Sequence, residues 1–276
     1  MFSNNLQNVT SPLGAGGITE AIILAGGLGT RLRSIIPDLP KCMAPVNGKP
    51  FIVYVIEYLY DQGIEKFILS VGYKHEIITG YFDSIKTQPK TQNLPAGQGG
   101  SKQKTKNLSL TTRRSPLTIH YSIEEEPLGT GGAIKLGCTR ATEKNILVVN
   151  GDTLFRIDIM KLSTFHHTCD AHCTLTLKPM KNFDRYGIVE LNKDNSIKSF
   201  KEKQHYDEGL INGGLYALNV NKFLETELPA AFSFEKDYLE KFYRQGKIFG
   251  VVQDEYFIDI GIPEDYQKAQ RELSDG

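Results

Sequence analysis

The sequence lacks an excess of charge of either sign. Lysine and arginine together number 32, aspartate and glutamate together also number 32, and the formal net charge is +0. Non-specific binding to nucleic acid depends on a basic excess that displaces counterions from the phosphate backbone. The composition therefore argues against a nucleic-acid partner, while it remains compatible with a local basic pocket for phosphate groups.

The sequence also lacks long hydrophobic runs and has few cysteines. No apolar run approaches the roughly 20 residues that a membrane-spanning helix needs, and the first twenty residues lack the charged and apolar regions of a signal peptide. The 4 cysteines, Cys42, Cys138, Cys169 and Cys173, are too scattered to suggest a disulfide framework. We expect a cytoplasmic protein with no membrane partner.

Two segments have no pattern typical of regular structure. Residues 1–18 are rich in Ser, Asn and Gly and are expected to form a flexible tail. Residues 84–116 are rich in Lys, Thr, Gln, Gly and Ser and have almost no apolar side chains, which predicts a mobile, positively charged insertion. We expect residues 19–276 to form a single domain that carries this insertion.

Strand-like and helix-like patterns alternate along the rest of the chain. Strands are expected at 20–25, 66–71, 117–123, 145–150, 171–177, 187–191, 197–201, 214–218 and 256–260. Helices are expected at 50–62, 75–82, 131–140, 157–167, 233–245 and 263–273. Alternation in the first half predicts an α/β fold with a Rossmann-like, mostly parallel sheet covered by helices. The clustered strands after residue 170 predict a small antiparallel extension.

The first strand runs into a glycine-rich loop, Gly26-Gly-Leu-Gly-Thr-Arg31. Such a loop lets backbone N–H groups approach a polyphosphate closely, and Arg31 could add a two-pronged phosphate contact. A tight turn would have the same composition. The loop matches neither the phosphate-binding P-loop nor the dinucleotide-binding glycine pattern, so on its own it leaves both interpretations open.

A second motif, Pro40-Lys-Cys-Met-Ala-Pro-Val46, follows the loop. Together the two resemble the signature of the sugar-1-phosphate nucleotidyltransferases, and the resemblance extends over nearly the whole chain from Thr19. The later family motifs occur in the family's order: Glu126-Pro-Leu-Gly-Thr-Gly-Gly-Ala133, Val149-Asn-Gly-Asp152, Phe200-Lys-Glu-Lys203, Asn212-Gly-Gly-Leu-Tyr216 and Phe257-Ile-Asp259-Ile-Gly-Ile-Pro. The resemblance implies a GT-A-like nucleotidyltransferase fold, with the antiparallel extension on the sugar side.

The resemblance also implies catalytic roles for Arg31, Lys41 and Asp152 and a Mg²⁺ site formed by Asp152 and Asp259. Without it, the ordinary interpretation of Lys41 is a solvated surface charge. Asp152 follows a buried apolar strand, where an unpaired carboxylate would be costly. Ligands bind at the carboxyl ends of parallel strands, although a cap of the following helix would explain Asp152 as well. The same reasoning applies to Asp259.

Further residues are implied to bind the two substrates, a nucleoside triphosphate and a sugar 1-phosphate. The nucleotide set is Leu24, Ala25, Gly26, Gly27, Gly29, Thr30, Glu126, Pro127, Gly129, Thr130 and Gly131. The sugar-phosphate set is Lys178, Gly187, Glu202, Lys203 and Asn212. Two structural alternatives stay open: Thr130 could cap a helix, and Lys178 could be an ordinary surface residue of a strand.

Two features need separate interpretation. Cys42 stands where the family usually has proline, so a backbone constraint is lost and a thiol lies beside the expected phosphate site. The cluster His166-His-Thr-Cys169-Asp-Ala-His172-Cys173 contains zinc-type ligands. Because Ala171, Cys173, Leu175 and Leu177 alternate as they would on the inward face of a strand, we favour a helix end followed by a core strand.

The implied reaction is attack by the sugar phosphate on the α-phosphorus of the triphosphate, with pyrophosphate leaving, for cell-surface polysaccharide synthesis. Within the family the sequence looks most like the D-glycero-D-manno-heptose 1-phosphate guanylyltransferases, which implies GTP as the nucleotide. Mannose-1-phosphate guanylyltransferase and glucose-1-phosphate thymidylyl- or uridylyltransferase are the alternatives. A non-catalytic paralogue that binds sugar nucleotides is the alternative from another class. The sequence leaves open whether the chain forms a homo-oligomer.

Overall fold

A computed structural model describes residues 17–27, 32, 35–87 and 117–273 of the chain. The expected tail and insertion therefore lie mostly outside the described residues. Where the tail and the insertion overlap the described residues, the structure differs from the expectation. Ile18 is buried in the core, and the helix expected to end at residue 82 continues to Thr87, past the start of the segment predicted to be irregular.

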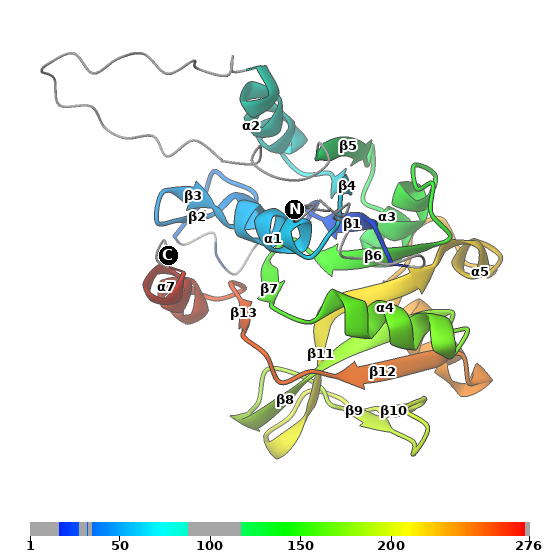
Figure 1. Ribbon diagram of the computed structural model, residues 1–276. Helices are drawn as coiled ribbons and strands as arrows, with labels where there is room; N and C mark the ends of the chain where they lie inside the picture. Colours follow the sequence, from blue (N-terminus) through cyan, green and yellow to red (C-terminus); the bar gives the residue numbers. More distant parts are fainter. Residues whose placement is uncertain (1–16, 28–31, 33–34, 88–116, 274–276) are drawn as a thin grey trace, which may run out of the picture.

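The centre of the molecule is a seven-stranded mixed sheet, which runs from top to bottom in Figure 1. Its strands, in spatial order, are β12 (Ile248–Val252), β8 (Cys173–Phe183), β11 (Tyr206–Asn219), β6 (Asn145–Asn150), β1 (Glu20–Leu24), β4 (Lys66–Val71) and β5 (Thr118–Ile123). Strands β6, β1, β4 and β5 are parallel. The expected parallel, helix-covered sheet is confirmed for this half.

The other half of the sheet contains the antiparallel strands, and the pair of β9 (Val189–Leu191) and β10 (Ile197–Phe200) beside it matches the expected small antiparallel extension. Strand β11 pairs antiparallel with both β6 and β8, and β8 pairs parallel with β12. These strands therefore continue the main sheet. Strand β12 was not expected from the sequence. Strand β8 ends later than expected and β11 begins earlier, because the two extend together as a ribbon whose outer residues are partly exposed.

Apolar side chains on both faces of the sheet build two core clusters. Ile23, Leu147 and Val149 face one cluster, whereas their neighbours Ile22, Ile146 and Val148 face the other. Successive residues of a strand point to opposite faces, so each central strand contributes to both clusters. This double burial explains why these strands are continuous apolar runs.

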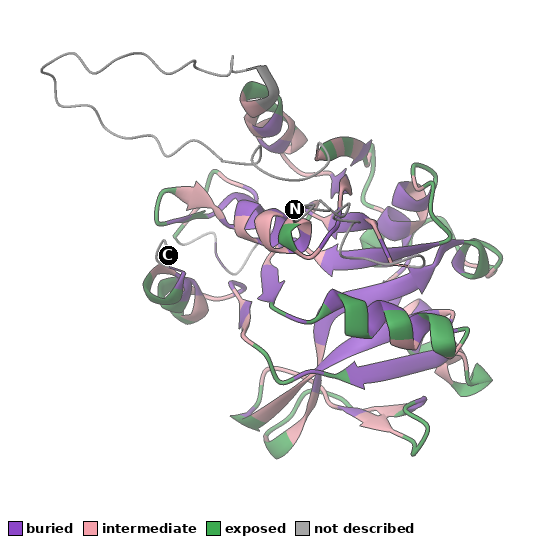
Figure 2. Cartoon of the chain, in the orientation of Figure 1, coloured by how far each residue is buried: buried purple, intermediate pink, exposed green. Residues whose placement is uncertain are grey.

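The helices complete the two layers. They are α1 (Phe51–Asp61), α2 (His75–Thr87), α3 (Gly129–Cys138), α4 (Ile159–Thr168), α5 (Val220–Leu224), α6 (Glu240–Phe242) and α7 (Pro263–Glu272). Asp158 caps α4 by accepting from Lys161 N. Figure 2 shows the exposed outer face of α4 over the buried strands. The helix expected at 233–245 is irregular: a π-helical turn, Phe234–Leu239, precedes α6.

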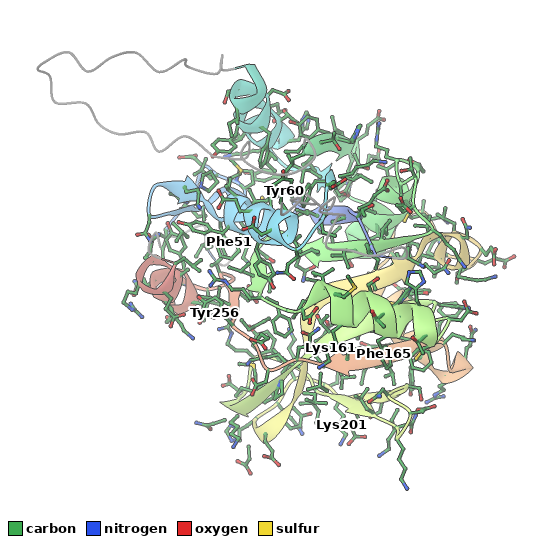
Figure 3. The ribbon with its side chains drawn as sticks, viewed as in Figure 1. Phe51, Tyr60, Lys161, Phe165, Lys201 and Tyr256 are labelled. Carbon is green, nitrogen blue, oxygen red and sulfur yellow. The ribbon has the colours of Figure 1, made fainter. Side chains whose placement is uncertain are left out.

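Three two-stranded antiparallel sheets flank the main sheet. They are β2 (Pro45–Val46) with β3 (Lys49–Pro50), β7 (Thr153–Phe155) with β13 (Phe257–Asp259), and β9 (Val189–Leu191) with β10 (Ile197–Phe200). The strand expected at 256–260 therefore pairs with β7 and not with the main sheet. Lys201, which follows β10, is labelled near the bottom of Figure 3, well below Phe51 of α1.

Candidate functional site

Three charged side chains from distant parts of the chain meet at one point. The Lys41 ammonium lies 2.5 Å from Asp152 Oδ2 and 3.4 Å from Asp259 Oδ1. Only 13% of the Lys41 side chain is exposed, compared with 31% for Asp152 and 20% for Asp259. Lys41 is therefore not the solvated surface charge that the sequence alone allowed, and the structure brings all three predicted residues together.

Local structure explains how these side chains converge. Strand β6 ends at Asn150, and a turn through Gly151 leads into β7, which places Asp152 at the carboxyl edge of the sheet. Strand β13 then pairs with β7 so that Asp259 faces Thr153, and Ile260 N donates to Asp152 O. Lys41 begins a short 3-10 helix, Lys41–Met43, directly after Pro40.

Hydrogen bonds hold the Asp259 carboxylate in one orientation. Oδ1 accepts from Gly261 N at 2.8 Å, and Oδ2 accepts from the Tyr186 hydroxyl at 3.3 Å. A Cβ at Gly261 would lie 2.8 Å from Asp259 Oδ1 and 2.9 Å from Lys41 Nζ, so any larger residue there would displace these two side-chain ends. Burial first, and then the nearby Asp259 charge, raises the pKa of Tyr186, so its hydroxyl remains a donor at neutral pH.

The two carboxylates fit a hard divalent cation. They converge on a single positive charge, and Mg²⁺ is typically bound by one or two carboxylates together with water and substrate phosphates. Among the residues that the structure describes, no group of three or more His, Cys, Asp or Glu side chains could form a complete metal cage. The remaining ligands of a metal at Asp152 and Asp259 would therefore come from substrate and water.

A cavity of about 640 Å³ opens at the carboxyl ends of β1, β4 and β5, beside the start of α3. This volume lies within the usual range for small-molecule sites. Its lining includes seven residues of the predicted nucleotide set: Leu24, Gly26, Gly27, Glu126, Pro127, Gly129 and Thr130. Gly29, Thr30 and the predicted catalytic Arg31 lie outside the described residues.

The remaining two residues of the nucleotide set do not line the cavity. Ala25 is buried beneath it and donates its N–H to Ser70 O. Gly131 instead faces Phe232, because a Cβ placed on Gly131 would lie 2.1 Å from the Phe232 ring. Gly131 was expected to bind the nucleotide. In the structure, the absence of a side chain at Gly131 makes room for the Phe232 ring of the core.

Thr130 does not cap helix α3, which was the structural alternative for this residue. Helix α3 already begins at Gly129, and its capping residue, Leu128, makes no side-chain capping bond. The Thr130 hydroxyl instead accepts from Phe234 N at 2.8 Å and lies 2.8 Å from a Glu235 carboxylate oxygen. Thr130 thus ties the cavity wall to the π-helical turn that starts at Phe234.

Sequence reasoning missed Glu124, which also lines the cavity. Its Oε2 accepts from Leu128 N at 3.0 Å, and burial is the main cause that raises the pKa of this carboxyl. Tyr73 and His75, at the start of α2, line the cavity as well. The available signal was topological, since Tyr73 and Glu124 follow β4 and β5 within two residues of the strand end.

The predicted sugar-phosphate residues lie on the β8–β11 ribbon and the loops beside it. Gly187 packs closely on the segment before Glu202, because a Cβ there would lie 2.2 Å from Lys201 O. Glu202 and Lys203 are exposed. Asn212 donates to the Tyr216 hydroxyl at 2.9 Å and accepts from Gly214 N at 3.1 Å, which fixes its amide.

Lys178 is placed differently from Asn212. It pairs in register with Ile211, the neighbour of Asn212, and neighbouring residues of a strand point to opposite faces. The Lys178 ammonium is ion-paired with Asp254. The geometry therefore favours the structural role that the sequence left open for this lysine.

Cys42 is buried at 3% exposure, and its thiol faces Ala25 O at 3.8 Å. Burial first, and then the Asp152 charge, raises the pKa of this thiol to about 12. Because a thiol reacts as its thiolate, Cys42 adds an inert buried group beside the site. Nothing in the described geometry makes it a nucleophile.

The cluster at 166–173 is a helix end followed by a core strand, as expected. His166 Nδ1 lies 2.9 Å from the Thr174 hydroxyl and Nε2 lies 3.3 Å from Asn145 Oδ1, so both ring nitrogens are engaged within the core. Cys173 is fully buried at the start of β8. Thr174 and Thr176 are buried as well, so β8 has no exposed face here.

Comparisons with known proteins agree with this geometry. A family model described as "Nucleotidyl transferase" matches residues 20–276. The D-glycero-alpha-D-manno-heptose 1-phosphate guanylyltransferase of Aneurinibacillus thermoaerophilus is 48% identical over 92% of this chain and 98% of its own length. The protein of the same description from Campylobacter jejuni is 44% identical over 90% of this chain and 96% of its own length.

Solved structures give the same result. HddC from Yersinia pseudotuberculosis, complexed with GMP-PN, superposes with a TM-score of 0.72 at 34% identity. The match covers 93% of this chain and 100% of that one. In the part of this chain that the structure describes, no helix is both long enough and apolar enough to cross a bilayer.

Proposed function

The chain belongs to the nucleotidyl transferase family, and from this premise we propose that it couples GTP to D-glycero-α-D-manno-heptose 1-phosphate. The products would be GDP-heptose and pyrophosphate. The convergence of Lys41, Asp152 and Asp259 beside the 640 Å³ cavity carries the catalytic part of the proposal. The relatives described as heptose 1-phosphate guanylyltransferases support the choice of substrates.

The reaction needs positioning and charge neutralisation more than proton transfer. A phosphate oxygen of the sugar 1-phosphate attacks the α-phosphorus of GTP, and the bond from that phosphorus to the oxygen bridging the β-phosphate breaks. Pyrophosphate leaves with the bonding electron pair. The attacking phosphate is already an anion, so no general base is required, and catalysis rests on orientation and electrostatic stabilisation.

The residues of this chain would supply that stabilisation. Asp152 and Asp259 would hold a divalent cation, for which we propose Mg²⁺, and such a cation would neutralise charge on the phosphates when bound. The Lys41 ammonium lies between the same two carboxylates. The ammonium could turn to the phosphates once the cation occupies this position. Arg31, which is not among the described residues, is expected to add a further contact to the phosphates.

Glu124 supports guanine as the base. An ionised carboxylate only accepts hydrogen bonds, and the edge of guanine carries two neighbouring N–H donor groups, whereas uracil and thymine carry a single one. Glu124 Oε2 accepts from Leu128 N, and the Ser70 hydroxyl also hydrogen-bonds to this carboxylate. Because each carboxylate oxygen has two acceptor positions, the positions that remain fit the paired donors of guanine better than the single N–H of uracil or thymine.

A substrate matrix tests the proposal. GTP, ATP, CTP, UTP and dTTP are each combined with the 1-phosphates of heptose, mannose and glucose, and both pyrophosphate and the nucleotide sugar are quantified. We expect GTP with heptose 1-phosphate to give the highest kcat/KM. A higher value for UTP or dTTP with glucose 1-phosphate would refute the substrate assignment, and no release with any pair would refute catalysis.

A carboxamide substitution tests the metal site. We expect Asp152→Asn to lower kcat at least about a hundredfold while the protein remains folded, because the loss of a metal ligand removes several kcal/mol of transition-state stabilisation. Asp170→Asn is the matched control, since the Asp170 side chain is 82% exposed and its positive φ of 44° suits asparagine. Near-normal turnover of folded Asp152→Asn would contradict the assignment.

A further inference from the structure

The strongest unassigned contact to the proposed metal site comes from Tyr186. Its hydroxyl donates to Asp259 Oδ2 at 3.3 Å, while the bonds from Gly261 and Lys41 reach Oδ1. Among the described residues, Tyr186 alone donates to Oδ2. Tyr186 lies between β8 and β9 and directly precedes Gly187, the glycine expected at the sugar phosphate.

Surrounding contacts hold the Tyr186 ring in place. It packs edge-on against Phe257 of β13, with ring centroids 6.3 Å apart. The Arg185 guanidinium lies 5.4 Å from the centre of the Tyr186 ring and is ion-paired with Asp265 of α7. The loop before Gly187 is thus connected through its side chains to both β13 and α7, the elements that carry and follow Asp259.

We propose that Tyr186 is a positioning residue that orients the Asp259 carboxylate for a divalent cation and couples cation affinity to occupation of the Gly187 loop. This inference rests on the metal role proposed above. Groups that hydrogen-bond to a ligating carboxylate fix its orientation, and their loss typically weakens metal binding about 10–100-fold. A sugar phosphate bound at Gly187 would contact the residue next to Tyr186 and would favour the loop position in which the Tyr186 hydroxyl reaches Asp259, so sugar phosphate and cation should each tighten the binding of the other.

The test is the affinity for Mn²⁺, measured by electron paramagnetic resonance with a GTP analogue whose α–β bridge cannot be cleaved. We expect Tyr186→Phe to weaken Mn²⁺ binding about tenfold, because the ring stays and only the hydroxyl is lost. Tyr256→Phe is the matched control: its hydroxyl also bonds a carboxylate, Glu272, at 2.9 Å, but it lies beside α7 (Figure 3) and should leave the affinity unchanged.

Adding sugar 1-phosphate to the same complex tests the coupling. The parent protein and Tyr256→Phe should bind Mn²⁺ several-fold more tightly with the sugar phosphate present, and Tyr186→Phe should show little of this gain. Equal Mn²⁺ affinity in the parent and Tyr186→Phe would overturn the positioning role, and an equal gain in both would overturn the coupling. If the parent itself bound no Mn²⁺, the proposed metal site would fail as well.

Discussion

At the scale of single residues, Lys41 connects the two carboxylates of the site, Asp152 and Asp259. Its ammonium contacts Asp152, which follows β6, and Asp259, at the end of β13. A lysine in this position neutralises two carboxylates that would otherwise repel each other. In the proposed reaction the same charge would stabilise the transferred phosphate, so we expect the residue to act mainly in the transition state.

We predict that Lys41→Met lowers kcat about 100-fold or more, the magnitude typical for loss of one preorganised electrostatic contact, while KM for GTP changes less. Steady-state pyrophosphate release measures both parameters. Lys49→Met is a suitable control. The Lys49 ammonium is ion-paired with Glu57 at a distance of 2.7 Å, and this pair does not belong to the site. A change in KM alone would make Lys41 a ground-state binding residue and would contradict this role.

Cysteine reactivity gives a second test at this scale. Burial raises the pKa of Cys42 and of Cys138 to about 12, and Cys173 is buried as well, whereas Cys169 is partly exposed. The three buried thiols therefore contain very little thiolate at pH 8. We expect iodoacetamide to label Cys169 alone in the native protein, as read by peptide mass spectrometry.

Unfolding the protein in urea should expose all 4 cysteines to the reagent and serves as the control. Rapid native labelling of Cys42 would show that the segment carrying Lys41 opens to solvent, which would contradict the packed site described above.

At the scale of elements, α3 is held by an unusually close contact between Gly131 and Phe232. A Cβ on Gly131 would lie 2.1 Å from the ring, and the N–H of Gly131 donates to Phe232 O at 2.9 Å. Glycine therefore sets the distance between α3, which forms one wall of the nucleotide cavity, and the segment that leads into the π-helical turn. Packing against Phe232 therefore explains why the family motif has a glycine at this position.

We predict that Gly131→Ala lowers the free energy of unfolding by about 1–3 kcal/mol, the usual cost of inserting a methyl group into a packed core. Urea denaturation measures this change. Gly80→Ala is the matched control, because Gly80 also lies in a helix but a Cβ there meets nothing within 4 Å. That substitution should stabilise the protein by up to about 1 kcal/mol through helix propensity.

The double variant Gly131→Ala/Phe232→Leu isolates the contact. Because leucine lacks the ring that the new methyl group meets, the two substitutions should cost less together than the sum of their separate effects. Simple additivity of the two free-energy changes would show that the Phe232 ring is not what excludes a side chain at Gly131.

At the scale of the whole molecule, His166 makes stability depend on pH. It links α4 to β8 and β6 through Thr174 and Asn145, and burial, followed by the neighbouring His167, lowers its pKa from 6.5 to about 4. The unfolded chain therefore takes up a proton at a higher pH than the folded one does. The stability due to neutral His166 is fully present above pH 6.5 and is lost as the pH falls toward 4.

We predict that the parent protein loses up to about 3 kcal/mol more stability between pH 7.5 and pH 4 than His166→Gln does. Urea denaturation at several pH values measures this difference, and a lower absolute stability of the variant at pH 7.5 does not affect the comparison. His120→Gln, at an exposed residue of β5, should retain the parent's pH dependence. An unchanged pH dependence in His166→Gln would refute the assignment.

The sequence by itself determined much of this protein. The apolar runs of β1, β4 and β6 identified a buried parallel sheet, because a strand covered on both faces has no polar alternation. The ordered motifs identified the family and the residues Lys41, Asp152 and Asp259. The inferences about fold and family are confirmed, because they depend on neighbours along the chain or on short patterns that survive in isolation; the roles of the three residues stay predictions.

Only the tertiary structure decided which of these residues meet and what each glycine is for. The pairing of β7 with β13, two strands of three residues each, brings Asp259 beside Asp152, and no local pattern of such length specifies a partner about a hundred residues away. Gly131 next to Phe232, Lys178 with Asp254, and Glu124 on the cavity wall are of the same kind. Contacts between distant segments follow from packing and register in three dimensions, which the order of residues along the chain does not display.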